Sequence, residues 1–145
     1  MSSGPRLRTD IVEVFVVRDG ELLLMRRAKE PMLGVFHPVL GHVEEGETAV
    51  EAAHRELREE TGLDEATGLV QLTCLERVRP YYIPETDSIV LSPRFLATAP
   101  GGWEPELCAE HDDKKWVASF EALDELHWPS QKEAWGEVLM RGMSL

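Results

Sequence analysis

The stretch from Gly41 to Leu63 constrains the fold of this chain more than any other part of the sequence. It reads GHVEEGETAVEAAHRELREETGL. Thr48 is a suitable N-cap, and Glu51 stands three residues later, where a capping box requires a carboxylate or amide. Gly62 is the residue type that commonly ends a helix in the left-handed conformation. The sequence therefore predicts a helix from Thr48 to about Thr61, preceded by a glycine-rich acidic loop.

Three glutamates of this helix, Glu56, Glu59 and Glu60, fall within about one turn and border the apolar stripe on one flank. The stripe consists of Ala49, Val50, Ala53 and Leu57. A solvated acidic face is the simplest interpretation. However, Glu60 lies at the edge of the stripe, where an unpaired charge is costly. Glu56 and Glu60 also repel each other by roughly 0.2–0.5 kcal/mol. A hard cation such as Mg²⁺, which prefers oxygen ligands, would relieve both penalties.

The loop before the helix contributes further oxygen atoms. Gly41 and Gly46 permit tight backbone turns, and the carbonyl of Gly41 is a ligand type that Mg²⁺ accepts. Glu44, Glu45 and Glu47 surround this approach, although a polar exposed loop would have the same composition.

Composition limits the classes of partner. The 145 residues fit one domain, and 43% are hydrophobic, enough for a core. The net charge of -12 disfavours binding to a nucleic-acid polymer or an anionic membrane, but not to a small phosphorylated substrate whose charge metal ions neutralise. Two cysteines, Cys74 and Cys108, indicate a reducing compartment. With no signal-peptide pattern and no long apolar run, we expect a cytoplasmic protein.

Outside the helix, apolar and β-branched runs separated by turn residues predict a mixed sheet covered by helices, an α/β protein. Residues 1–8 are expected to form a flexible tail and residues 9–145 a single domain. Strands are predicted at 11–17, 22–26, 35–40, 69–79, 88–98 and 115–118, with turns at 80–87 and helices at 120–126 and 130–140.

The acidic segment resembles the Nudix box, the signature of the Nudix hydrolases. Every specified position of the box is occupied by the expected residue. These residues are Gly41, Glu47, Arg55-Glu56-Leu57, Glu59-Glu60 and Gly62-Leu63. The resemblance implies an α/β/α sandwich with a mixed β-sheet between helices. It also implies hydrolysis of a nucleoside diphosphate linked to another moiety, on a small nucleotide-type substrate. Family members are often homodimers.

The resemblance further implies roles for single residues. Glu56, Glu59 and Glu60, with the carbonyl of Gly41, would bind Mg²⁺, with Mn²⁺ as the alternative. Arg55 would orient glutamates such as Glu47 or Glu56. Glu56 is a candidate base for the attacking water, but in this family the base sometimes lies outside the box.

A second segment, Glu110-His111 followed by Trp116-Val117, resembles the one in diadenosine tetraphosphate hydrolases and dihydroneopterin triphosphate pyrophosphatases. The segment from Tyr81 to Leu91, with Pro93-Arg94-Phe95 after it, also resembles these enzymes, and this looser similarity favours a nucleoside triphosphate or a dinucleoside polyphosphate over a sugar nucleotide. Glu110 would complete the metal site or act as base, or would be a solvated loop carboxylate. His111 would contact phosphate or be an ordinary loop histidine.

Other candidates for substrate binding depend on residue type alone. Arg26 and Arg27 would contact phosphate or form an exposed cluster of charges. His37 would face the pocket or pack within its strand. The aromatic side chains that could stack on a base are Tyr81, Tyr82 and Trp103.

Two alternative functions stay open. A non-catalytic sensing or interaction module on the same fold would be expected to lose box glutamates, and here all are present. An isopentenyl-diphosphate isomerase-like enzyme would need a catalytic cysteine near the site, and neither cysteine lies in an evident motif.

Overall fold

The structure, a computed structural model, describes residues 3–142. Its large sheet contains, in spatial order, β10 (His111–Ala118), β3 (Glu21–Arg27), β2 (Ile11–Arg18), β9 (Arg94–Thr98) and β6 (Gln71–Cys74). Two short strands extend it, since β4 (Phe36–His37) pairs with β3 and β5 (Val39–His42) pairs with β2. The sheet is mixed, because β2 and β9 are parallel and the other pairs are antiparallel.

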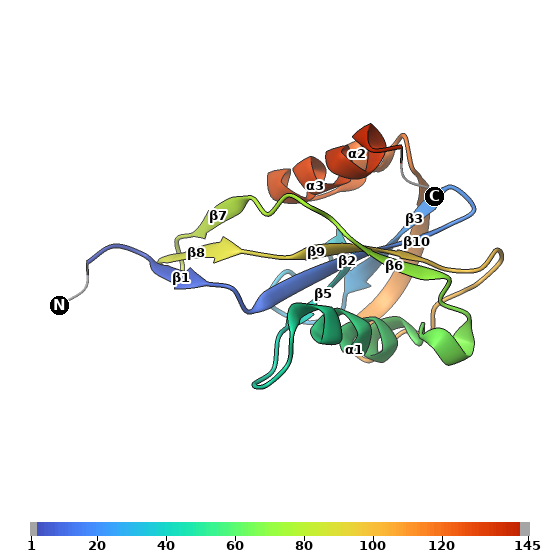
Figure 1. Ribbon diagram of the computed structural model, residues 1–145, viewed down its shortest axis with the longest axis horizontal. Coiled ribbons are helices and arrows are strands. Elements are labelled where there is room, and N and C mark those ends of the chain that lie inside the picture. The colour runs from blue at the N-terminus through green and yellow to red at the C-terminus, as the bar shows by residue number, and fades with distance from the viewer. Residues whose placement is uncertain (1–2, 143–145) are drawn as a thin grey trace.

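A small sheet extends from one end of the molecule (Figure 1). It contains β1 (Arg6–Arg8), β8 (Ser88–Leu91) and β7 (Pro80–Ile83), with β8 in the middle. The predicted tail of residues 1–8 is therefore too long, because Arg6–Arg8 pair with Ser88–Val90. Met1 and Ser2 lie outside the described residues.

Helices cover both faces of the large sheet (Figure 1). The helix α1 (Ala49–Thr61) lies on one face, and α2 (Ala122–Glu125) and α3 (Pro129–Met140) lie on the other. A short 3-10 helix, Glu65–Thr67, follows α1. Successive residues of β2 point to opposite faces. Val14 and Val16 therefore join the core under α1, whereas Phe15 and Val17 join the core under α3. The predicted α/β/α sandwich with a mixed sheet is confirmed.

Two prolines break strands that the sequence predicted as continuous. Pro38 separates β4 from β5, which pair with different partners, and Pro93 lies between β8 and β9, which belong to different sheets. Proline has no N–H group to donate to a ladder, so each proline marks the point where the chain changes partner.

The remaining differences concern boundaries. The strand predicted at 69–79 ends at Cys74, and residues 80–83, predicted as a turn, form β7. The strand predicted at 115–118 begins four residues earlier, at His111. The first residues of β10 are in a strand because they pair with β3, which is distant in the sequence. Such pairing cannot be predicted from the local sequence pattern.

Candidate active site

Local capping interactions set both ends of the helix α1. The amide of Glu51 donates to Thr48 Oγ1 at 3.1 Å, and the amide of Thr48 donates to Glu51 Oε1 at 3.0 Å. Gly62 has φ of 79° and its amide bonds the carbonyl of Arg58. The predicted capping box and stop signal are both present, and they fix the glutamates of the helix relative to β5 and β2, against which it packs.

The buried face of α1 differs from the predicted stripe. Val50 is 43% exposed, whereas Ala52 and Ala53 are fully buried. The buried face is therefore centred on the line of Glu56 and Glu60, not beside it. The reason is the packing of the sheet, which buries Ala52, Ala53 and Leu57 and leaves Val50 exposed.

Glu60 is a buried carboxylate without a partner. It is 3% exposed, and neither carboxylate oxygen has a hydrogen-bond partner within the described residues. Burial, followed by the neighbouring carboxylate of Glu56, raises the pKa of Glu60 well above the usual carboxyl range. An arrangement of this kind is costly for folding alone, since buried polar groups are normally paired. It indicates a side chain kept for a ligand.

Arg55 joins the loop and helix carboxylates. Its Nε donates to Glu47 Oε2 at 2.8 Å, and its Nη1 donates to Glu56 Oε1 at 2.8 Å and Glu59 Oε2 at 3.1 Å. Its Nη2 donates to the carbonyl of His42 at 2.7 Å. The hydrogen bonds from Arg55 lower the pKa of Glu47 to about 2. These contacts fit the orienting role that the resemblance implied for Arg55.

Gly41 leaves room for the side chain of Glu56. A Cβ atom at position 41 would lie 2.1 Å from Glu56 Cδ and 2.5 Å from its Oε1. The glycine is therefore required by close approach. Any larger residue would displace the carboxylate, so the backbone of β5 and the Glu56 carboxylate form one surface.

His37 and His111 form a buried pair behind Glu60. The Nε2 atoms of the two rings lie 3.3 Å apart. His37 Nδ1 lies 2.6 Å from the carbonyl oxygen of Pro38 and must donate to it, so His37 Nε2 accepts from His111 Nε2. His111 Nδ1 is then the acceptor facing Cys108 Sγ at 3.8 Å. Burial lowers the pKa of both histidines, that of His111 to about 4.

This placement changes the interpretation of the histidines. Both were candidates for substrate contact, but both are buried, and the side chain of His111 is 0% exposed. Its Nε2 lies 3.7 Å from Glu60 Oε1. The rings therefore support the box from behind, and a phosphate would reach them only if the structure opened.

Arg26 and Arg27 point to opposite faces of the large sheet. Arg27 lies on the same face of β3 as Leu23 and Met25, which belong to the core under α1. Arg26 lies on the opposite face, because successive residues of a strand alternate between faces. Arg27 Nη1 lies 3.5 Å from Glu110 Oε2. Arg26 Nε donates to Asp112 at 2.7 Å. Only Arg27 is thus on the face of the box, where it approaches the exposed carboxylate of Glu110.

The predicted ligands are close in the fold but do not yet converge. Among residues 3–142, no group of three or more histidine, cysteine or acidic side chains is already arranged around one point. The reason is visible in the contacts, because Arg55 holds Glu56 and Glu59 while Glu60 points inward. Metal binding would require Glu59, whose side chain is 54% exposed, to turn away from Arg55.

The aromatic candidates are dispersed. Trp103 packs edge-on against Trp116, within the apolar core under α1. Tyr82 is exposed on the small sheet and donates to Asp87, and Tyr81 is half-buried beside it. The structure does not bring these three rings together as one stacking platform.

Sequence reasoning missed a buried cluster on the other face of the sheet. Glu13 is 1% exposed, and its carboxylate accepts from Arg94 Nε and Gln131 Nε2, each at 2.7 Å. The available signal was a charged residue in the middle of the run IVEVFVV, a strand that is buried on both faces. A charge at such a position requires a partner from elsewhere in the chain.

Residues 7–136 match the model of the NUDIX domain. Over 136 residues the chain is 33% identical to an octanoyltransferase of Myxococcus xanthus, in an alignment that covers 92% of this chain and 37% of that protein. It is 44% identical over 52 residues to an ADP-ribose pyrophosphatase of Methanocaldococcus jannaschii, covering 36% of this chain and 31% of that protein.

A solved structure shares the fold over nearly the whole chain. The E. coli dihydroneopterin triphosphate pyrophosphohydrolase aligns with a TM-score of 0.78 at 24% identity, covering 94% of this chain and 99% of that one. The chain belongs to the NUDIX domain family. It spans only about a third of the length of the two curated relatives named above, so their names do not transfer to it as whole proteins. Within the described residues, no helix is both long and apolar enough to cross a membrane.

Proposed function

We propose that this protein is a Mg²⁺-dependent Nudix hydrolase that cleaves the diphosphate linkage of a nucleotide. The observation that carries the proposal is the environment of the box glutamates. Within residues 3–142, Glu60 is buried without a hydrogen-bond partner, Glu56 fills the space that Gly41 leaves, and Arg55 fixes both Glu47 and Glu56.

The donor set fits a hard divalent cation. The carboxylates of Glu56, Glu59 and Glu60 and the carbonyl of Gly41 are all oxygen ligands, the kind that Mg²⁺ prefers. A cation would also supply the partner that both oxygens of Glu60 lack within the described residues. Mn²⁺ is the alternative metal, because it accepts the same ligands.

When bound, Mg²⁺ neutralises phosphate charge and lowers the pKa of a coordinated water. The protein's own residues orient the box carboxylates and exclude water. Arg55 keeps Glu47 ionised and orients both Glu47 and Glu56, so that these groups need no reorganisation when substrate arrives. The histidine pair occupies the space behind Glu60 and excludes water from it.

Two carboxylates are candidates for the general base. Glu56 is 15% exposed and held by Arg55, which suits a fixed ligand. The side chain of Glu110 is 53% exposed, and among the described residues its carboxylate pairs with Arg27 alone, at 3.5 Å, so it is free to swing towards a water molecule. We propose Glu110 as the base and Glu56 as a ligand, with Arg27 releasing Glu110 when phosphate binds.

The substrate class rests on similarity. The curated relative from Methanocaldococcus jannaschii is named a pyrophosphatase, and the loose resemblance of the segment Tyr81–Leu91, with Pro93-Arg94-Phe95 after it, favours a nucleoside triphosphate or dinucleoside polyphosphate. The net charge of -12 agrees with a small substrate accompanied by metal ions, not with a nucleic-acid polymer. A cytoplasmic location and a homodimer stay predictions. Sedimentation measurements would test the oligomeric state.

A substrate panel tests the proposal. Release of phosphate, pyrophosphate or nucleotide is measured for nucleoside triphosphates, dinucleoside polyphosphates and nucleotide sugars, with Mg²⁺ and with EDTA. Hydrolysis of at least one compound with Mg²⁺ alone supports the proposal. Absence of hydrolysis across the panel contradicts it and favours a non-catalytic module.

The same substrate panel can test the alternative of an isopentenyl-diphosphate isomerase-like enzyme. Cys108 contacts His111, which lies beside Glu60, so one cysteine is closer to the box than the sequence indicated. Isopentenyl diphosphate is therefore included, with isomerisation followed by NMR. We expect no conversion, because Cys108 Sγ faces the buried ring of His111 and lies in no evident catalytic motif.

A further inference from the structure

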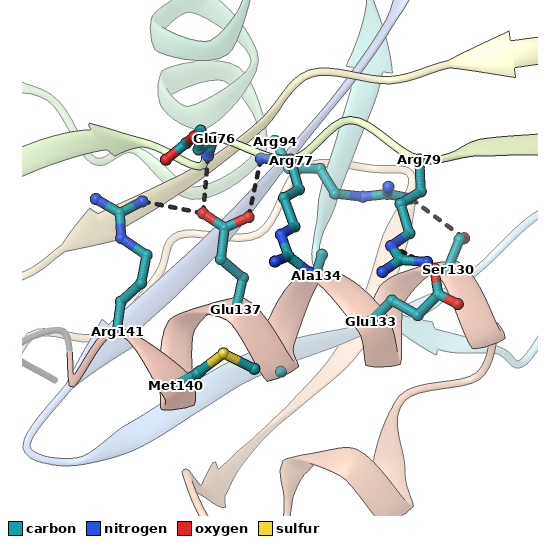
Figure 2. Close-up of a pocket in the computed structure, with 11 residues that line it drawn as sticks. Glu76, Arg77, Arg79, Arg94, Ser130, Glu133, Ala134, Glu137, Met140 and Arg141 are labelled. Carbon is teal, nitrogen blue, oxygen red and sulfur yellow. Dashed lines mark hydrogen bonds and ion pairs between the residues drawn. The ribbon is translucent and has the colours of Figure 1, made fainter.

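A cavity of about 330 Å³ lies on the side of the sheet opposite the box. One wall is α3, and the other is formed by the segment 76–79 between β6 and β7, with Arg94 of β9 at its base (Figure 2). No residue of α1 lines it, so the cavity is separate from the proposed active site.

Positive charge is concentrated around this cavity. Four arginines line it, Arg77, Arg79, Arg94 and Arg141, against three carboxylates, Glu76, Glu133 and Glu137. The whole chain has 15 basic and 27 acidic residues. Arg94 is paired with Glu13, which lies outside the lining, so four arginines balance four carboxylates here, whereas acidic residues are in excess in the chain as a whole. An anion would meet less repulsion here than over most of the surface.

The carboxylates differ in how far they neutralise these arginines. Glu137 is 8% exposed and accepts hydrogen bonds from the amides of Glu76 at 2.7 Å and Arg77 at 2.9 Å, so it fixes the segment in place. Glu133 approaches Arg79 at 3.4 Å, with both side chains about half exposed, and such pairs exchange readily. Arg77 has no ion pair within the described residues, and its guanidinium extends towards α3 (Figure 2).

The base and wall of the cavity are rigid and open. Arg94 is 4% exposed, held by Glu13 at 2.7 Å, and its Nη2 lies 3.2 Å from Ser130 Oγ. Gly136 stands inside α3, where glycine costs about 1 kcal/mol relative to alanine. A Cβ atom there would meet nothing within 4 Å. The helix therefore keeps a glycine where packing does not demand one, and the space beside it stays free.

We propose that this cavity is a second ligand site, which binds a small phosphomonoester. Planar guanidinium groups bind phosphate oxygens through paired hydrogen bonds. Here Arg77 and Arg79 present them from the segment 76–79, and Arg141, which also donates to Glu137 at 2.9 Å, presents one from the end of α3. Ala134 and Met140 line the same cavity and suit the organic part of the ligand. The site does not depend on the proposed hydrolase activity.

Amide chemical shifts of the ¹⁵N-labelled protein, recorded in EDTA so that hydrolysis does not contribute, test this site. Inorganic phosphate and AMP are titrated separately. We expect saturable shifts at the amides of Glu76 and Arg77, with AMP binding more tightly than phosphate. Equal binding of the two would overturn the phosphomonoester assignment, since the organic part would then contribute nothing.

Three variants complete the experiment. Arg77→Gln is expected to weaken AMP binding about tenfold, since it removes a charge-assisted hydrogen bond. Gly136→Leu is expected to fill the cavity and abolish binding, with the circular dichroism spectrum unchanged. Arg6→Gln, which removes an exposed arginine elsewhere, is the matched control. The site is refuted if wild-type protein shows no saturable shifts, or if Arg77→Gln binds no more weakly than Arg6→Gln.

Discussion

Nε2 of His111 lies 3.7 Å from Oε1 of Glu60, yet the two groups form no hydrogen bond. The proton on this nitrogen is directed at His37, whose other ring nitrogen donates to the carbonyl of Pro38. The two histidines therefore hydrogen-bond to each other, and within the described residues the Glu60 carboxylate has no hydrogen-bond partner. This arrangement favours a divalent cation as the missing partner of Glu60.

Glu60→Gln should stabilise the metal-free protein while removing activity. The folded-state pKa of Glu60 is raised above its ordinary value of 4.5, so the unfolded chain ionises first as pH rises. Above that value, each pH unit lowers the free energy of unfolding by up to about 1.4 kcal/mol, until the folded group ionises. Urea denaturation in EDTA should show a larger advantage of Glu60→Gln at about pH 8 than at about pH 5.5.

Glu85→Gln is the matched control, since Glu85 lies in an exposed turn. It should match the wild type at both pH values. Equal stability of wild type and Glu60→Gln in EDTA would show that the buried carboxylate carries no folding cost.

Arg55→Lys should lower kcat by about 10²-fold, the scale expected when catalytic groups are misplaced by about an ångström. Lysine keeps the charge but cannot bond Glu47, Glu56 and the carbonyl of His42 simultaneously. Steady-state kinetics on the best substrate of the panel gives the comparison. Arg58→Lys, on the exposed side of the same helix, should retain wild-type kcat, and an equal loss there would rule out a specific role for Arg55.

Gly41→Ala should destabilise the fold by about 1–3 kcal/mol, because the new methyl group collides with Glu56. Shortening the partner should relieve the collision. The double variant Gly41→Ala/Glu56→Asp should therefore be more stable than the sum of the single effects, with a coupling energy of at least about 0.5 kcal/mol in a double-mutant cycle. Strict additivity would contradict the close approach.

Protonation of His111 should lower the free energy of unfolding as pH decreases from about 6.5 to about 4, whereas the raised pKa of Glu60 acts in the opposite direction over most of this range. Burial lowers the folded-state pKa of His111 from 6.5 to about 4, so the unfolded chain takes up the proton first. Its contribution is complete above about 6.5 and is lost as pH falls towards the folded pKa, at up to about 1.4 kcal/mol per pH unit. In urea denaturation across this range, His111→Gln should remove this acid-dependent loss of stability relative to the wild type. Substitution of the exposed His127 should not.

The box helix was predictable because its signals are local. Thr48, Glu51 and Gly62 act within a few residues of their own positions, and the structure places all three as predicted. The depth of Glu60 was not predictable, because it depends on how the sheet packs against Ala52 and Ala53. Wheel geometry gives the order of residues around a helix, but not the centre of its buried face.

The histidine pair illustrates the same limit at longer range. His37 and His111 are separated by 74 positions and meet because β4 and β10 both pair with β3. No local pattern reports such a meeting. In contrast, the opposite directions of Arg26 and Arg27 follow from strand geometry alone and could have been predicted.

The most direct test of the central claim compares the wild type with Glu60→Gln in the substrate panel, with Mg²⁺ and with EDTA. Our interpretation predicts hydrolysis of a nucleotide diphosphate linkage by the wild type with Mg²⁺ alone. It also predicts no measurable turnover by Glu60→Gln, which should remain folded and be more stable without metal. Turnover by Glu60→Gln at the wild-type rate, or hydrolysis by the wild type in EDTA, would contradict it.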